Sequence, residues 1–132
     1  MKVTLCSSVT PEIQALWNES LSEISDSRGG PEFLLQISNG EELSSLLSMS
    51  VSNKELWIHE SSNAVALCRE GVILGIYVRP NDRRKGIARS IINDLISACG
   101  AVDGYALPGD RATKSLYESI GWKARLLTMR GE

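Results

Sequence analysis

The stretch "VRPNDRRKGIARSIINDL", residues 78–95, carries four arginines and one lysine around a single glycine, Gly86. An apolar run, "VILGIYV", leads into it, and apolar pairs recur every fourth residue after Gly86, which is typical of an amphipathic helix. The first N–H groups of a helix lack partners inside the helix and carry partial positive charge, so they bind phosphate well. A strand, a cationic loop and a helix start in this order indicate a phosphate or pyrophosphate site. On spacing alone, a solvated basic loop that caps a helix remains an alternative.

The common nucleotide-binding motifs do not account for this loop. A nucleotide P-loop needs two glycines and GK[ST], and a dinucleotide-binding turn needs three glycines, whereas "RRKGIA" has one. A nucleic-acid backbone is a rival ligand for a basic helix start. Aromatic residues make up only 5% of the chain, however, and no long basic stripe accompanies the loop, so we expect no nucleic-acid partner.

The first half of the chain predicts a strand, then a helix, then a segment of unclear structure. "KVTLCSSV" has the composition of a strand, and Thr10 followed by Pro11 is typical of a helix start. Apolar residues at helical spacing predict a helix over residues 11–26, which the "GGP" of residues 29–31 ends. In residues 32–50, the run "EFLLQI" fits either a helix or a strand, and the run "NGEELSSLLSM" is typical of a short helix.

The second half predicts a three-stranded antiparallel meander, followed by alternating helices and strands. "ELWIHE", "AVALCRE" and "VILGIYV" are short apolar runs separated by turns, and Gly75 within the third indicates a bulge or a close approach of another backbone. The basic loop and its helix come next, and Gly100 ends that helix. "AVDGYAL" then predicts a strand, "GDRATKSLYESIG" a helix and "WKARLLTM" a final strand.

Two motifs in this half together resemble the GNAT family of N-acetyltransferases. The first is a strand ending in V-x-P, followed by R-x-x-G-x-A, in which Arg83, Gly86 and Ala88 hold the signature positions. The second is "LYESIGW", residues 116–122, which is similar to the family's L-Y-E-x-x-G-[F/W]. The motifs come in the family's order and cover about residues 72–130. The resemblance implies a single domain over residues 1–132, of α/β (α+β) class. Its sheet would be mixed, mostly antiparallel and six- to seven-stranded, with helices on both faces.

The resemblance also implies an activity, the transfer of an acetyl group from acetyl-CoA to a primary amine by direct attack in a ternary complex. The loop amides would hold the pyrophosphate of coenzyme A, and the strand ending at Val78 would pair with its pantetheine arm. The Ile76 amide would polarise the thioester carbonyl, and Asp110 stands where the family often has a pantetheine-contacting Asn. The cofactor-binding residues implied are Ile76, Val78, Arg83, Arg84, Lys85, Gly86, Ile87, Ala88, Arg89 and Asp110.

Tyr117 matches the family's general acid, and Ile76 and Tyr117 are the two catalytic residues implied. A departing thiolate should have a pKa of about 8.5 and a phenol one near 10, so a tyrosine hydroxyl can hydrogen-bond or protonate the sulfur. A core tyrosine on an amphipathic helix is the alternative role. A domain that binds acyl-CoA without turnover, as a sensor or an interaction partner, is the alternative function.

Composition and charge set the remaining expectations. The 132 residues are 42% apolar and 23% charged, as in soluble globular proteins, and three distant cysteines suit a reducing, cytoplasmic setting. We expect no metal, no membrane span and, from the family, a possible homodimer. Residues 1–50 carry two cations and seven acids, and residues 51–132 twelve cations and nine acids. The excess of acids in the first half indicates either a binding site for a cationic amine acceptor or the solvated faces of helices. No sequence motif identifies the acceptor.

Overall fold

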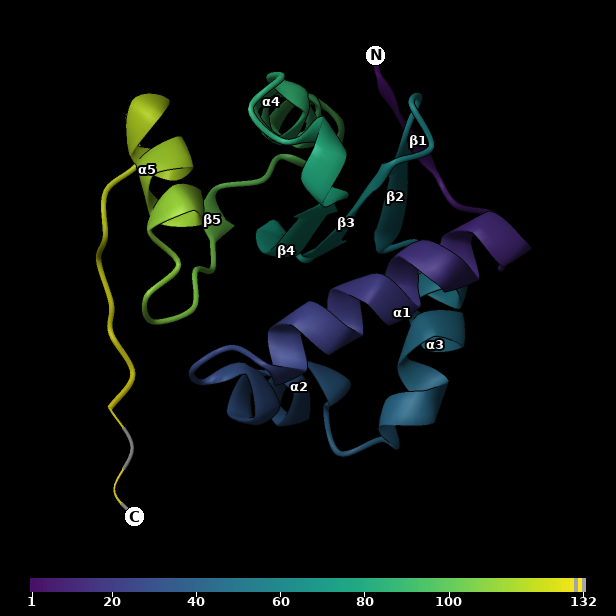
Figure 1. The fold of residues 1–132 in the computed structure, drawn as a ribbon, viewed down its shortest axis with the longest axis horizontal. Helices are drawn as coiled ribbons and strands as arrows, with labels where there is room; N and C mark the ends of the chain where they lie inside the picture. The colour runs from purple at the N-terminus through teal and green to yellow at the C-terminus, as the bar shows by residue number, and fades with distance from the viewer. Residues whose placement is uncertain (130, 132) are drawn as a thin grey trace.

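One five-stranded sheet forms the centre of the computed structural model, which describes residues 1–129 and 131 (Figure 1). The strands lie in chain order, and the first four are antiparallel. The last strand pairs parallel to its neighbour at Val72↔Asp103 and Ile73↔Gly104. The strands are β1 (Val3–Leu5), β2 (Leu56–His59), β3 (Ala64–Arg69), β4 (Val72–Val78) and β5 (Asp103–Gly104). The expected mixed class, the mostly antiparallel sheet and the meander are confirmed.

Helices cover both faces of this sheet, as expected (Figure 1). One face holds the helices of the first half, and the other holds α4, which follows the basic loop, together with α5. The first group is α1 (Pro11–Ser25), α2 (Gly30–Ser38), the 3-10 turn η1 (Leu43–Ser45) and α3 (Leu46–Ser52). The second group is the 3-10 turn η2 (Pro80–Asp82), α4 (Ile87–Cys99) and α5 (Arg111–Ser119).

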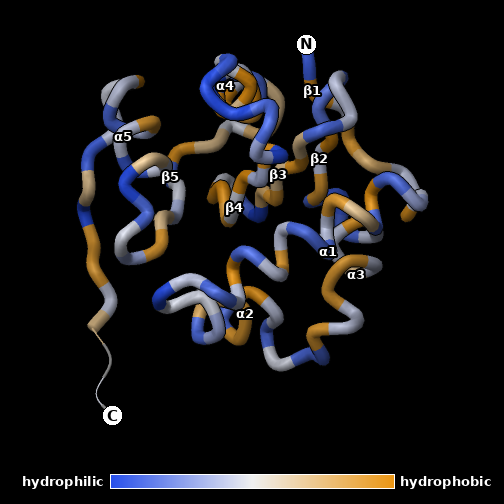
Figure 2. The backbone as a smooth tube through the Cα atoms, in the orientation of Figure 1, coloured by the Kyte–Doolittle hydropathy of each residue, from blue (hydrophilic) through white to orange (hydrophobic). Residues whose placement is uncertain are grey.

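Strand β3 separates two apolar clusters because its side chains alternate between the faces. Val65 and Leu67 pack with α1, α2 and α3, whereas Ala66 and Cys68 pack with α4 and Tyr117. Figure 2 shows the central strands as mostly hydrophobic and the loop before α4 as hydrophilic. Complete burial of an aliphatic side chain such as that of Leu95 contributes about 1.5–3 kcal/mol, so these clusters hold both helical layers to the sheet.

The helix boundaries follow the capping signals of the sequence. The Thr10 hydroxyl accepts from the Ile13 N–H at 3.2 Å, and Pro11 occupies the first turn of α1. Gly100 adopts a left-handed conformation at the end of α4, with φ of 64°. The ambiguous run "EFLLQI" lies in α2, where Leu34 and Ile37 are buried on one side of the helix.

Two strand predictions need correction, and the sheet has five strands in the described residues rather than six or seven. The run "AVDGYAL" contributes only the two residues of β5. The predicted final strand "WKARLLTM" is not part of the sheet, and its Leu126 is 92% exposed. A strand needs a partner edge and a face to bury, and the two-residue β5 offers this segment neither.

No helix in the described part of the chain is both long and apolar enough to cross a membrane.

Candidate cofactor site

The basic loop presents a run of main-chain N–H groups without intramolecular acceptors. None of the six amides of residues 84–89 donates a hydrogen bond within the described chain, and the first loop bond after them runs from Ser90 N–H to the Gly86 carbonyl. Arg84 and Gly86 both have positive φ, of 64° and 81°, which turns successive amides toward one side. A Cβ added at Gly86 would meet no atom within 4 Å, so the space beside this backbone is open. The loop can therefore hold an anion with main-chain donors.

The second half of β4 has an unpaired edge that leads to this loop. Arg79 N–H donates to the Asn63 carbonyl at 2.9 Å, so in an antiparallel ladder the pairs Ala64↔Val78 and Ala66↔Ile76 are not hydrogen-bonded to each other. The main-chain groups of Ile76 and Val78 therefore face away from β3. On that side β5 pairs only with Val72 and Ile73, so no strand of the described residues pairs with the edge beyond.

β4 has a bulge just before this free edge, and a bulge is one of the two features that Gly75 predicted. Leu67 lies opposite Gly75, but Cys68 lies opposite Ile73, so β4 has one extra residue at Leu74. After the bulge, Ile76 and Val78 come into register with β3 so that their N–H and C=O groups point to the free edge. These are the two strand positions that the family resemblance assigns to the cofactor.

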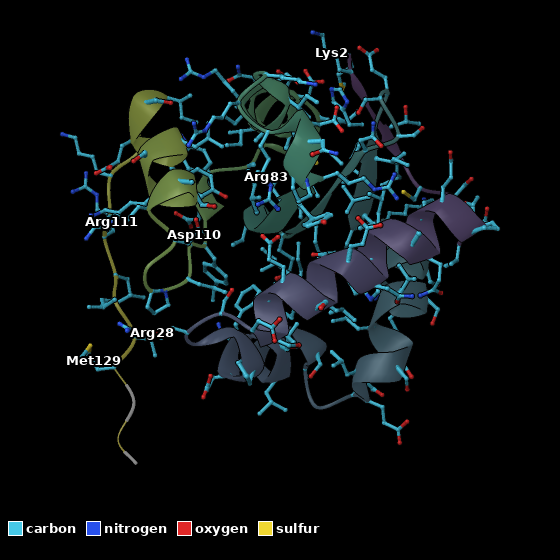
Figure 3. All side chains as sticks on the ribbon, in the orientation of Figure 1. Lys2, Arg28, Arg83, Asp110, Arg111 and Met129 are labelled. Carbon is cyan, nitrogen blue, oxygen red and sulfur yellow. The ribbon has the colours of Figure 1, made fainter. Side chains whose placement is uncertain are left out.

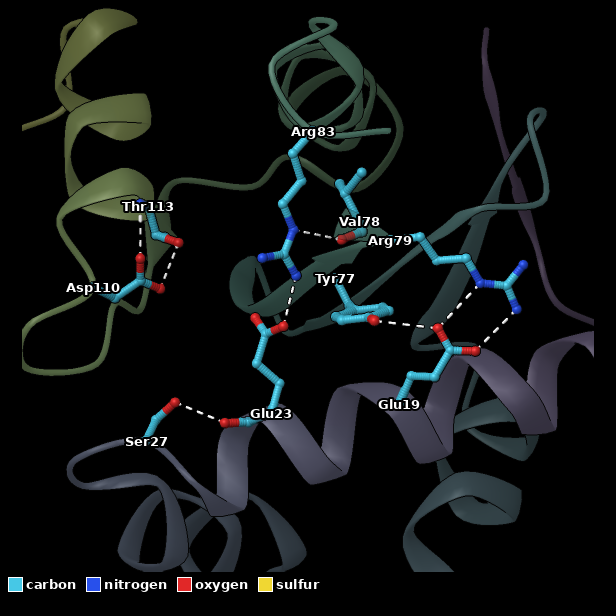
Figure 4. A network of polar contacts seen from close by, with 9 residues as sticks. All are labelled: Glu19, Glu23, Ser27, Tyr77, Val78, Arg79, Arg83, Asp110 and Thr113. Atoms are coloured by element: carbon cyan, nitrogen blue, oxygen red, sulfur yellow. Dashed lines mark hydrogen bonds and ion pairs between the residues drawn. The ribbon is translucent and has the colours of Figure 1, made fainter. Parts of the chain in front are cut away.

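The Arg83 side chain is held by other groups of the protein rather than left free at the mouth of the loop. Its Nε donates to the Val78 carbonyl at 2.8 Å, and its Nη2 lies 2.6 Å from Glu23 Oε2 of α1 (Figure 4). The guanidinium also lies 5.7 Å from the centre of the Tyr77 ring. Figure 3 shows this side chain pointing from the loop into the space between α4 and α1.

The other loop cations keep more freedom. Lys85 Nζ lies 3.5 Å from Asp82 Oδ1, and Arg89 donates to the Ser119 hydroxyl of α5 at 2.9 Å. Arg84 makes no ion pair within the described residues. Arg84, Lys85 and the main-chain amides are therefore the groups available to a polyanion, and Arg89 ties the start of α4 to the helix that carries Tyr117.

Tyr117 packs over Gly104 of β5, the strand that pairs with the first residues of β4. A Cβ at Gly104 would come within 2.3 Å of the Tyr117 ring, and the ring stacks on Trp122 with centroids 5.3 Å apart. The residue is 7% exposed, and its hydroxyl is buried without a hydrogen-bond partner in the described chain. Burial, then the nearby Cys68 and Asp110, raise the pKa of the phenol well above its usual range. The hydroxyl is therefore protonated at neutral pH and able to donate.

Asp110 has a structural partner in the same helix. Its side chain accepts from the Thr113 N–H at 3.1 Å and from the Thr113 hydroxyl at 2.7 Å, and so caps α5. Both carboxylate oxygens are engaged in this way. Contact between Asp110 and pantetheine stays a prediction, and it would have to use the remaining lone pairs.

The sequence analysis missed an acidic pair on α1. Glu19 accepts from the Tyr77 hydroxyl at 3.2 Å and pairs with Arg79 at 3.0 Å, and Glu23 holds Arg83 one turn later (Figure 4). The hydrogen bond from Arg79 is the main cause that lowers the pKa of Glu19. Their spacing of four residues places both on one side of a helix and could have signalled a joint partner.

Two hollows in the described residues have no lining residue from the basic loop. The roomier one, of about 320 Å³, lies beside β1, β2 and the start of α1, and its lining includes Cys6 and His59. The smaller hollow, of about 30 Å³ between α1, α2 and the bulge, has apolar walls, including Trp17, Phe33 and Gly75, and room for about one water molecule. It does not take an amine acceptor in this conformation. In the described residues, no three His, Cys, Asp or Glu side chains are placed to hold a metal ion together.

No protein-family model matches this chain, and no curated protein matches it either. The likeness to the GNAT family therefore rests on the two motifs, residues 78–88 and 116–122.

Proposed function

We propose that this protein is an acyl-CoA-dependent N-acyltransferase that moves an acetyl group from acetyl-CoA to a primary amine. The observation that carries the proposal is the run of six unpaired amides, residues 84–89, at the end of the unpaired edge of β4. A diphosphate suits the amides, and an extended arm with amide groups suits the strand edge, because both partners use main-chain donors and acceptors. Coenzyme A joins these two chemical features in one molecule.

The residues present fit such a cosubstrate. Gly86 leaves open space beside the loop backbone, Arg84 and Lys85 add positive charge, and Ile76 and Val78 offer main-chain groups along the edge. The unpartnered Tyr117 hydroxyl is a buried donor against Gly104 of β5, the strand next to β4. Buried polar groups are nearly always hydrogen-bonded, so an orphaned donor favours a partner from outside the chain.

Acetyl-CoA supplies an activated acetyl thioester. The neutral amine nitrogen would attack the carbonyl carbon, the C–S bond would break and the sulfur would depart as a thiolate with the electron pair, while the proton lost by the nitrogen would pass to solvent. The Ile76 N–H is the donor that would stabilise negative charge on the carbonyl oxygen, an effect of about 3 kcal/mol at comparable sites. Tyr117 would donate to the departing sulfur. Because burial raises the pKa of its phenol, a hydrogen bond to the thiolate is favoured over complete proton transfer.

A second candidate is a domain that binds acyl-CoA without turnover. The burial of Tyr117, at 7% exposure beneath Trp122 and against Gly104, favours this reading, because a substrate reaches the hydroxyl only after a local rearrangement. In either role, three free cysteines suit a reducing compartment such as the cytoplasm.

One experiment separates the candidates. Acetyl-CoA is titrated calorimetrically into the protein, and thiol release is then followed with a panel of primary amines. Binding together with turnover that falls at least tenfold in Tyr117→Phe supports the enzyme and the role of the phenol. Binding without turnover across the panel supports the sensor, and absence of binding contradicts both.

A further inference from the structure

The Val78 carbonyl is the last acceptor on the free edge of β4, and the protein's own Arg83 covers it. The register turns this oxygen away from β3, and Arg83 Nε donates to it at 2.8 Å. Arg83 follows only five residues later, so the loop folds this side chain back onto the strand that it leaves. A partner strand or an amide arm on this edge would use the same oxygen.

Two groups from other elements hold Arg83 in this position. Glu23 of α1 accepts from Nη2 at 2.6 Å, and the Tyr77 ring lies 5.7 Å from the guanidinium carbon. The side chains of Arg83 and Glu23 are 41% and 51% exposed. An exposed ion pair of this kind is weak, so the contact can open and close readily.

We propose that Arg83 and Glu23 form a displaceable latch over the end of β4, and that binding of the acyl carrier's amide arm must open it. The inference rests on the proposed function, because it concerns the same edge and the same ligand. The arm's N–H replaces Arg83 Nε at the Val78 carbonyl. The freed guanidinium then lies beside the loop, where it adds a cation for the diphosphate.

The latch lowers the apparent affinity of the site. When only a fraction of molecules has the edge open, the measured dissociation constant rises by the inverse of that fraction. Loss of Glu23 removes one of the groups that keep the latch closed, so the open fraction rises. We expect about a threefold gain in affinity from Glu23→Gln, the size expected for an exposed ion pair.

The test uses two probes and one matched control variant. Acetyl-CoA reports on the whole site, and uncharged pantetheine reports on the edge alone, which separates the latch from simple charge attraction. Glu19→Gln removes an equal charge one helical turn earlier, from a carboxylate that pairs with Arg79, and the amide oxygen of glutamine can still accept from the Tyr77 hydroxyl. NMR titration of the native protein and both variants gives the dissociation constants, including weak ones.

Glu23→Gln is expected to bind both probes about threefold more tightly than the native protein, with Glu19→Gln close to native. The Arg83 Nε–H signal of the ligand-free protein should be protected from exchange and lose protection in Glu23→Gln. Unchanged or weaker binding of pantetheine by Glu23→Gln, while the native protein binds it, overturns the latch and leaves the proposed function intact. If the native protein binds neither acetyl-CoA nor pantetheine, the proposed function is overturned and the latch with it. A protected Arg83 Nε–H would in that case mark a structural ion pair alone.

Discussion

The Tyr117 hydroxyl is costly to the fold as it stands. A buried polar group without a partner loses about 1–3 kcal/mol relative to a satisfied or apolar one, and phenylalanine has the same ring without that loss. The ring alone accounts for the stacking on Trp122, whereas the ring and the hydroxyl both lie against Gly104. At this position the stability of the fold favours phenylalanine, whereas the proposed chemistry requires the tyrosine hydroxyl.

Tyr117→Phe should therefore raise the free energy of unfolding by about 1 kcal/mol while it reduces thiol release at least tenfold. Denaturant unfolding and the amine-dependent assay measure the two effects independently on the same preparation. A fall in stability instead would mean that the hydroxyl has a partner in the folded chain, and the argument from the orphaned donor would fail.

Gly104 provides the space that the Tyr117 ring occupies. A methyl group at this position would come within 2.3 Å of the ring, so Gly104→Ala should cost about 1–3 kcal/mol and displace the ring from Trp122. Gly75→Ala is the control, because a Cβ there meets nothing within 4 Å. Unfolding curves of both variants give the comparison, and equal stabilities would show that the ring has room to move.

At the scale of elements, local signals predicted the helices and the meander well. The Thr10 cap, the four-residue repeat after Gly86 and the short turns between β2, β3 and β4 are properties of neighbouring residues, and the structure has each of them. The strands after α4 were predicted less well, because strand formation depends on an available partner edge. β5 is shortened to two residues, and residues 122–129 lie outside the sheet.

The start of α5 shows how one residue supports two interpretations. From the family resemblance, Asp110 was a cofactor contact, and the geometry places it as the N-cap that accepts from Thr113. Asp110→Ala should reduce stability by about 1 kcal/mol, with a much smaller loss in Asp110→Asn, which keeps a capping oxygen. Thermal or denaturant unfolding checks this order. An equal loss in the two variants would contradict a capping role.

At the scale of the whole molecule, the acidic first half and the basic second half meet where α1 lies beside the end of β4. Two acids of α1, Glu19 and Glu23, pair with Arg79 and Arg83 at the end of β4. From the composition alone, these acids could have been solvated side chains or part of a binding site for a cationic substrate. The sequence could not decide this, because the pairing joins residues 60 positions apart and depends on how α1 crosses the sheet.

This pairing makes stability depend on acid pH. Arg79 lowers the pKa of Glu19, so the Glu19 carboxylate stabilises the fold above its ordinary pKa, and that contribution is lost as the pH falls through the lowered value. We expect native protein to be more stable than Glu19→Gln near pH 7 and the difference to shrink below about pH 4.3, the ordinary glutamate pKa. Unfolding midpoints of both proteins between neutral and acid pH measure this difference. A difference that stays constant with pH would contradict the pairing.

The central claim is that the amides of residues 84–89 bind the diphosphate of an acyl-CoA along the free edge of β4. An amide-resolved NMR titration of ¹⁵N-labelled protein with acetyl-CoA tests it most directly. The largest shifts should fall on residues 84–89, with further shifts at Ile76 and Val78. Saturation of the protein with no shift at these amides, or no shifts at all, would contradict the account.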